Sequence, residues 1–378
     1  MRKIAALLVF LAHAAHGSDL AIVGAKAYAP KAIDDSVILI RDGRIAAIGR
    51  RGDVRLPHGA EVINATGRFL LPGFWNSHVH LLDPSVAVKL MHYGFTTVVD
   101  SGSVLEKTLA LRRRIDAGEI DGPRIVTAGE PVFPPGGSPV MLEPLVMPEI
   151  RDASQAAAIV DAHRGAEALK LYMVSWMNPG QPAMALAPAR ALAAGAHRRG
   201  MLVLAHPQNS DGLQTALDAG ADVMMHTTPD GGPWSDALLA QLLRQHVALT
   251  PTLTLWSQEL RGKPQPLVDG FIDIAIEQLR AFRRGGGTVL FGTDAGYLED
   301  LDPTEEYARM ARAGMSFAEI LDSLTANPAR VFRRAKTGAL RRGYEADLVI
   351  LDADPAADAR NFGHVSAVIR GGKVVAQR

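Results

Sequence analysis

The 378-residue sequence contains no cysteine, which excludes both a disulfide framework and a lipidated cysteine. It also lacks an excess of either charge, because 40 lysine and arginine residues balance 40 aspartate and glutamate residues. A neutral chain offers no strong field for nucleic acid or for an anionic membrane surface. Long charge runs, low-complexity tracts and internal repeats are absent as well. The length therefore fits one large domain, or a large domain with a small one beside it.

Long apolar runs are confined to the N-terminus. Arg2 and Lys3 precede the apolar run Ile4 to Ala12, and Ala15-His16-Gly17 then offers the small residues of a signal-peptidase site. This pattern predicts a signal peptide over residues 1–17 and export of the mature chain, to the periplasm in a Gram-negative host. The run is too short to span a bilayer, so we expect no stable membrane anchor after cleavage.

Short strand-like segments occur at both ends of the chain. Near the N-terminus, Asp42-Gly43 lies between two apolar runs, which is a typical hairpin signal. Similar segments return after Ala346, with a Gly371-Gly372 turn. Because the two ends resemble each other and differ from the middle, we predict that residues 18–67 and 333–378 form one small β-sandwich domain.

The middle of the chain, residues 68–332, alternates between strand-like and helix-like segments. The candidate strands are Phe69–Trp75, Thr96–Asp100, Arg124–Ala128, Ala168–Tyr172, Met201–Ala205, Asp222–Met225, Ala248–Leu253 and Thr288–Gly292. The candidate helices include Lys107–Ala117, Ser154–Arg164, Leu186–Arg199, Asp211–Ala219 and Leu238–Gln245. This α/β alternation predicts a (β/α)8 TIM barrel, whose functional residues belong at the C-terminal ends of the strands.

Histidines, a lysine and an aspartate lie at or near the ends of five candidate strands. The first strand runs from Leu71 into His78 and His80, and residues i and i+2 of a strand point to the same side. Two imidazoles that converge in this way form a metal-ligand geometry. The other strands contribute Lys170 on the fourth, His206 on the fifth, His226 on the sixth and Asp294 on the eighth.

Each of these residues also has an ordinary structural explanation. Lys170 can extend to the surface, His206 and His226 can be hydrogen-bonded core residues, and Asp294 can cap a helix. Six compatible groups at the ends of five strands nevertheless favour a metal centre. A catalytically silent binding protein on the same scaffold would lack a ligand, and none is missing.

Several motifs together resemble those of the amidohydrolase superfamily, in particular its imidazolonepropionase-like and prolidase-like metal-dependent hydrolases. Pro72-Gly73-Phe74 leads into His78-Val79-His80, and Gly292-Thr293-Asp294 ends the eighth strand. Two further motifs are Leu324-Thr-Ala-Asn-Pro-Ala329 and the Gly338 to Val349 segment, where the chain returns to the β-rich domain in that superfamily. The resemblance covers nearly everything after the signal peptide.

The resemblance implies a centre with two divalent metal ions. His78, His80 and Asp294 would hold one ion, His206 and His226 the other, and Lys170 would bridge them after N-carboxylation by carbon dioxide. Zinc is the favoured ion, although manganese, cobalt and iron also suit imidazole and oxygen ligands. The implied reaction is hydrolysis by a metal-bridging hydroxide, with Asp294 as general base and then general acid.

Differences from individual groups of the superfamily indicate which of them this chain resembles most. Adenosine-type deaminases have a glutamate shortly after the fifth-strand histidine, whereas Pro207 follows His206 here. Dihydroorotases have an arginine where this chain has Leu82, and imidazolonepropionase lacks the lysine ligand. Prolidase-like peptidases fit best, although they usually have histidine where this chain has Ser138.

We therefore predict hydrolysis of an amide or peptide bond in a small-molecule substrate, either a dipeptide or an N-acyl amino acid. Hydrolysis of a lactone or another ester at the same centre is the alternative, and the sequence also allows a homo-oligomer. Tyr172 shares the inward face of Lys170, where its hydroxyl can serve the substrate or only the packing. Four aromatic residues are candidates for an apolar pocket or for ordinary packing: Trp176, Trp234, Trp256 and Tyr297.

Overall fold

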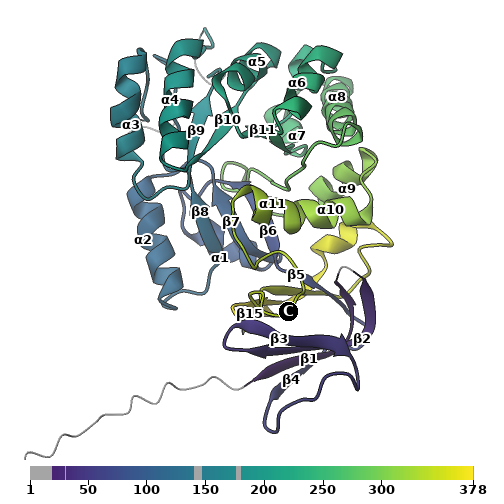
Figure 1. Ribbon diagram of the computed structural model, residues 1–378. Helices are drawn as coiled ribbons and strands as arrows, with labels where there is room; N and C mark the ends of the chain where they lie inside the picture. Colours follow the sequence, from purple (N-terminus) through teal and green to yellow (C-terminus); the bar gives the residue numbers. More distant parts are fainter. Residues whose placement is uncertain (1–18, 30, 140–146, 176–179, 378) are drawn as a thin grey trace, which may run out of the picture.

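The computed structural model describes residues 19–29, 31–139, 147–175 and 180–377. The described chain forms an α/β barrel with a β-rich sheet at one side (Figure 1). The predicted signal peptide lies outside the described residues, so export stays a prediction. None of the helices in the described ranges is long and apolar enough to cross a membrane.

The β-rich part is a single hydrogen-bonded sheet to which both ends of the chain contribute. Its strands follow the order β15-β14-β13-β5-β1-β2-β3, and β4 pairs with β1. The N-terminal strands are β1 (Leu20–Tyr28), β2 (Ala32–Arg41), β3 (Arg44–Arg50), β4 (Glu61–Asn64) and β5 (Phe69–Pro72). The C-terminal strands are β13 (Leu348–Leu351), β14 (Val365–Arg370) and β15 (Lys373–Gln377).

The predicted hairpin turn at Asp42-Gly43 joins β2 to β3. Both residues have positive φ, 50° and 70°, which suits a two-residue turn between twisted antiparallel strands. Side chains on one face of the sheet, among them Ile22, Ile38 and Ile350, form a separate apolar core. The β-rich domain of both chain ends is therefore held together by its own buried face.

The barrel contains seven regular strands among the described residues, and all their pairings are parallel. They are β6 (Phe74–Val79), β7 (Phe95–Asp100), β8 (Arg124–Thr127), β9 (Ala168–Tyr172), β10 (Leu202–His206), β11 (Val223–Met225) and β12 (Ala248–Thr250). Strands β6 to β8 form one ladder and β9 to β12 another. Single bridges join the ladders, Val132 to Leu171, Leu249 to Val289 and Val79 to Ala295.

The eighth predicted strand, Thr288–Gly292, is wrong as a regular strand. Around it the structure has only isolated bridges, Leu249 to Val289, Val79 to Ala295 and Ala295 to Leu298. This segment instead closes the barrel through single backbone hydrogen bonds, Leu290 N–H to Leu249 O and Ser77 N–H to Phe291 O. The apolar run was correct as a buried segment, but apolar pattern alone does not reveal how regularly it is paired.

The first predicted strand, Phe69–Trp75, is divided at Gly73. Strand β5 before it pairs with β1 and β13 in the β-rich sheet, and β6 after it pairs with β7 in the barrel. A Cβ atom at Gly73 would lie 2.3 Å from Thr96 Oγ1, so glycine is required by close approach. The chain thus passes directly from one part of the molecule into the other.

Helices surround the barrel strands (Figure 1). The α-helices are α1 (Ser85–Met91), α2 (Leu105–Asp116), α3 (Ala156–Ala162), α4 (Leu186–Arg198), α5 (Ser210–Ala219), α6 (Asp236–Arg244), α7 (Leu255–Glu259), α8 (Gln265–Arg284), α9 (Thr304–Arg312), α10 (Phe317–Leu324) and α11 (Ala326–Val331). Short 3₁₀ helices lie at Ala153–Gln155, Pro229–Gly231 and Ala359–Gly363. The five helices expected from the sequence are present, with shifts of a few residues at their ends. The 20-residue α8 was not predicted.

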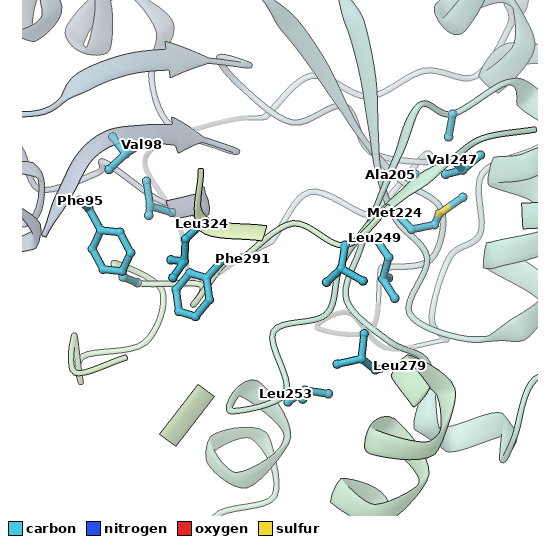
Figure 2. Close-up of a cluster of buried hydrophobic side chains, with 14 of the residues drawn as sticks. Phe95, Val98, Ala205, Met224, Val247, Leu249, Leu253, Leu279, Phe291 and Leu324 are labelled. Carbon is cyan, nitrogen blue, oxygen red and sulfur yellow. The ribbon is translucent and has the colours of Figure 1, made fainter. Parts of the chain in front are cut away.

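Two layers of apolar side chains fix the barrel. Outward-facing side chains of the strands pack against the helices. Figure 2 shows this for Phe95 and Val98 of β7, which lie with Leu324 of α10. Inward-facing side chains form a second core in which Trp75 stacks on Phe332 at a ring-centroid distance of 6.0 Å. Strand β9 shows the alternation: Leu169 and Leu171 face the helices, whereas Ala168 belongs to the inner core. Lys170 and Tyr172 share that inner face.

Candidate metal centre

The first two candidate residues lie where β6 meets the segment around Asp294. Asp294 N–H donates to His78 O at 2.9 Å, and His80 N–H donates to Ala295 O at 2.8 Å. Gly296 follows with φ +94°, and a Cβ atom there would lie 1.9 Å from His80 O. These main-chain contacts place the carboxylate of Asp294 directly beside the His-x-His pair.

Asp294 and the two histidines form a compact buried group. Asp294 Oδ1 lies 3.0 Å from His80 Nε2 and 3.3 Å from His78 Nε2. Their potential ligand atoms all lie within 4.8 Å of one another, and the three residues are buried. Two imidazoles and one carboxylate in this arrangement match the donor set of a zinc site.

The other three candidates adjoin this group. Lys170 Nζ lies 3.4 Å from His78 Nε2 and is fully buried. The ring of His226 lies 4.6 Å from that of His78 and 4.7 Å from that of His206, between centroids. The structure therefore brings together all six groups that the sequence singled out, from the barrel positions that the pattern predicted.

Two histidines have one ring nitrogen held by a partner outside the group. His80 Nδ1–H donates to Gly102 O at 2.8 Å, and His206 Nε2–H donates to Gln208 Oε1 at 3.1 Å. A neutral imidazole with one nitrogen protonated has a lone pair on the other. These contacts therefore leave His80 Nε2 and His206 Nδ1 as donor atoms for a metal.

Some buried atoms of the group have no hydrogen-bond partner among the described residues. They include Asp294 Oδ1 and His206 Nδ1, as well as His78 Nδ1. His226 Nδ1 lies 2.6 Å from Thr252 Oγ1, which leaves its Nε2 for the centre. Buried polar atoms rarely lack partners, so atoms such as Asp294 Oδ1 and His206 Nδ1 fit a role as metal ligands.

The protonation states also suit metal binding. Burial, reinforced by the nearby Lys170 ammonium, lowers the pKa of His206 to about 3. Burial likewise holds the pKa values of His78 and His226 well below the usual range, so these imidazoles are neutral at pH 7. Burial lowers the pKa of Lys170 to about 7, against the opposing charges of Asp294 and Asp100. A large fraction of the Lys170 amine is therefore neutral near pH 7.

Asp100, which the sequence did not single out, supports the centre from the end of β7. Its fully buried carboxylate accepts hydrogen bonds from Ser103 Oγ at 2.6 Å, Thr127 Oγ1 at 2.8 Å and Thr108 Oγ1 at 3.2 Å. It also accepts from the backbone N–H of Leu81, the residue after His80. A buried carboxylate with four donors fixes the loop that follows the His-x-His pair.

A cavity of about 300 Å³ opens above the metal group. Tyr172 lies in its wall, stacked on His206 at a centroid distance of 4.3 Å. The expected aromatic residues Trp256 and Tyr297 also line it. Further lining residues were not predicted, among them Phe133, Met147, Gln208, Leu255 and Glu259. They lie in loops or in α7, where no periodic pattern indicates which side chain faces inward.

Trp234 and Trp176 do not join this wall in the described structure. Trp234 is buried elsewhere, where its indole N–H donates to Thr228 Oγ1 at 2.7 Å and its ring packs edge-on against Phe282. Of the two alternatives left open for Trp234, the structure therefore supports ordinary packing. Trp176 lies outside the described residues.

Ser138 has a structural contact in place of the imidazole that relatives usually carry. Its hydroxyl accepts the backbone N–H of Met147 at 3.2 Å, and its own N–H donates to Glu149 Oε1. Ser138 is not among the described residues that line the cavity, whereas Leu82 is.

Comparison with known proteins agrees with this geometry. The model of the amidohydrolase family matches residues 69–375. Ochratoxinase of Aspergillus niger is 23% identical over 409 residues, which cover 90% of this chain and 82% of the relative. A dihydroorotase of Anaeromyxobacter dehalogenans is 26% identical over 376 residues, 84% of each chain.

Among solved structures, a Xaa-Pro dipeptidase with bound methionine superposes with a TM-score of 0.84 at 21% identity. The match covers 96% of this chain and all of that one, so the barrel with its β-rich domain is shared. Three observations agree: a family match over most of the length, a group of potential metal ligands at the strand ends, and a common fold. The chain belongs to the amidohydrolase family.

Proposed function

We propose that this protein uses two divalent metal ions to hydrolyse an amide or peptide bond in a small substrate, a dipeptide or an N-acyl amino acid. The observation that carries the proposal is the meeting of six ligand-type groups, from four barrel strands and the segment that closes the barrel, at the base of a 300 Å³ cavity. Membership of the amidohydrolase family supports hydrolysis of a C–N bond. The likeness to an Xaa-Pro dipeptidase is one of fold.

In this proposal the ligands divide into two sets. His78, His80 and Asp294 hold one ion, and His206 and His226 hold the other. Lys170 would join the two sets as a carbamate, which forms when its neutral amine adds carbon dioxide and releases one proton. The position of Lys170 beside His78, and its lowered pKa of about 7, make the neutral amine available for this reaction. Zinc suits a site of imidazole and oxygen donors.

When bound, the ions supply water activation at neutral pH and polarisation of the substrate carbonyl. Asp294 accepts the proton of the attacking water and returns it to the leaving nitrogen, as general base and then general acid. Because Oδ1 is the oxygen that faces His78 and His80 and would bind the ion, the second carboxylate oxygen accepts this proton. The Tyr172 hydroxyl donates to the substrate oxygen; burial raises the pKa of this phenol, which keeps it protonated.

Chelation and reconstitution test the metal requirement. We expect dialysis against EDTA to reduce amide hydrolysis at least about 100-fold, and Zn²⁺ with bicarbonate to restore it. The assay should use parallel sets of dipeptides, N-acyl amino acids and lactones. Full activity of metal-free protein would contradict the mechanism. Turnover of lactones without turnover of amides would show that the substrates are esters and not amides.

Replacing Lys170 tests the carbamate separately. In Lys170→Ala we expect metal content, measured by elemental analysis, to fall from two ions per chain to one or fewer, because the shared oxygen ligand is lost. Lys89→Ala is the matched control, since Lys89 is an exposed lysine on α1. Two ions per chain and unchanged activity in Lys170→Ala would rule out the carbamate.

A further inference from the structure

A second carboxylate faces the cavity besides that of Asp294. Glu259, the last residue of α7, lines the cavity together with Trp256 and Tyr297. Its Oε1 accepts a hydrogen bond from Tyr297 Oη at 2.7 Å. Glu259 is partly buried, and the ring of Tyr297 lies 6.4 Å from that of His80. We call Glu259, Trp256 and Tyr297 the Glu259 subsite.

No basic side chain of the described residues neutralises Glu259. Its hydrogen-bond partner is a phenol. Burial raises the pKa of Glu259, as expected for a carboxylate that lacks a cation, and the negative charge of Asp294 also raises this pKa. Arg261 and Lys263, which follow α7, line a different surface cavity.

Among the described residues, the cavity wall contains no lysine or arginine side chain. Its basic members among the described residues are the imidazoles of His80 and His206, both in the metal group. The sequences of segments 140–146 and 176–179 contain no lysine, arginine or histidine. A substrate carboxylate would therefore meet Glu259 rather than a basic side chain.

The loops after the barrel strands also contain more acidic than basic residues, although the whole chain is neutral. Loops 80–84, 101–104, 128–152, 173–185, 207–209, 226–235, 251–254 and 293–303 contain a single arginine or lysine, Arg151. Their acidic members among the described residues are Asp83, Glu130, Glu149, Asp152, Asp230, Asp294, Glu299, Asp300 and Asp302. Such a face raises the local concentration of cations and repels anions.

We propose that Glu259 determines specificity by binding a cationic group of the substrate, an alkylammonium or guanidinium, with Trp256 and Tyr297 beside it. The proposal rests on the proposed amide hydrolysis and narrows its substrates to amides that carry a basic side chain. A carboxylate supplies the counter-charge, and adjacent aromatic rings attract a cation through their faces. Tyr297 keeps the Glu259 carboxylate in position through its hydroxyl.

The binding test uses pentylamine, which is protonated at neutral pH, and pentan-1-ol of similar length as its neutral counterpart. By calorimetry with the metal-loaded protein, we expect pentylamine to bind about tenfold more tightly or better. Glu259→Gln should abolish the difference. Glu299→Gln, which removes an exposed acid outside the described cavity wall, should keep it. Equal binding of the two probes by the unmodified protein would overturn the proposal.

The kinetic test compares Ala-Lys and Lys-Ala with the same dipeptides in which norleucine replaces lysine. We expect kcat/KM to favour one of the lysine peptides about tenfold or more, and Glu259→Gln to remove this preference. Glu299→Gln, outside the described cavity wall, should keep both the preference and the rate with the norleucine peptides. If the preference for lysine peptides survives in Glu259→Gln, the role of Glu259 is contradicted, whereas the proposed amide hydrolysis is not. If no amide of any class is hydrolysed, the proposed function fails, and the binding test still decides the role of Glu259.

Discussion

At the scale of single residues, the centre combines a strained backbone with buried side chains whose pKa values favour the neutral form. His226, Thr252 and Asp294 have φ values of 76°, 45° and 60°, in the left-handed region that residues with a side chain rarely adopt. Strain of this kind persists where the surrounding structure imposes it, and it is concentrated at functional sites. Here it is imposed by backbone hydrogen bonds such as Asp294 N–H to His78 O.

Lys170 should make the metal-free chain less stable near neutral pH. Its pKa falls from 10.5 in the unfolded chain to about 7 in the fold. Between these two pH values Lys170 is protonated in the unfolded chain but neutral in the fold, so the free energy of unfolding rises with pH. Below pH 7 the amine is charged in both states, and the cost of burying its charge applies in full. We expect Lys170→Met to stabilise the metal-free chain at pH 7 by on the order of 3 kcal/mol.

Urea unfolding of metal-free protein at pH 7 and pH 9.5 measures this effect. The gain from Lys170→Met should be smaller at pH 9.5, whereas Lys89→Met should change stability little at either pH. A Lys170→Met variant that is less stable at pH 7 would show that the amine stabilises the fold.

At the scale of elements, short strands end in loops that are held by buried carboxylates from elsewhere. Glu306 of α9 is fully buried and accepts from Leu253 N–H and Thr254 N–H, both at 2.8 Å, and from Thr254 Oγ1 at 2.7 Å. Arg309 adds a hydrogen bond from Nη1 to Leu253 O. This cluster fixes the loop that leads from β12 into α7, and so it also positions the Glu259 subsite.

Removing the Glu306 carboxylate should therefore weaken both the fold and the cavity. In Glu306→Ala three donors lose their acceptor, which we expect to lower the free energy of unfolding by about 3 kcal/mol. Glu305→Ala, one residue earlier and exposed, breaks a pair with the buried Arg309, which keeps its hydrogen bond to Leu253 O, and should cost about 1 kcal/mol or less. Denaturant unfolding compares the two variants, and equal losses would argue against this role of Glu306.

At the scale of the whole molecule, ion pairs fasten the barrel to the β-rich sheet. Arg124 of β8 donates from Nη1 to Asp347 Oδ2 at 2.6 Å and from Nη2 to Glu345. Both acids directly precede β13, the strand that pairs with β5. Gly73 N–H also donates to Asp347 O, at the point where the chain passes between the two parts.

Loss of this contact should destabilise the whole chain. Arg124→Met leaves two partly buried carboxylates without their cation, and we expect about 2 kcal/mol less stability. Arg114→Met removes an exposed pair with Glu119 and should cost about 0.5 kcal/mol or less. Thermal unfolding of the two variants checks this, and an unchanged midpoint for Arg124→Met would indicate that the two parts are held by apolar packing alone.

The sequence by itself determined the fold class and the six-residue group. His78, His80, Lys170, His206, His226 and Asp294 follow strand patterns that can be recognised locally. A closed parallel barrel brings the C-terminal ends of its strands together whatever the loops do. Alternation along each strand also decides which side chains face inward, so a pattern of single residues was enough to predict a cluster in space.

Only the tertiary structure decided what surrounds that group. Loop paths and short helices have no period that marks an inward side, so Glu259 was missed, and the sequence left open whether Trp234 lines the cavity or only packs. The same reason explains the eighth barrel segment, which is joined by isolated bridges rather than a regular ladder. The ligands of the proposed metals are set by strand geometry, whereas the proposed preference for a cation depends on where α7 directs one carboxylate.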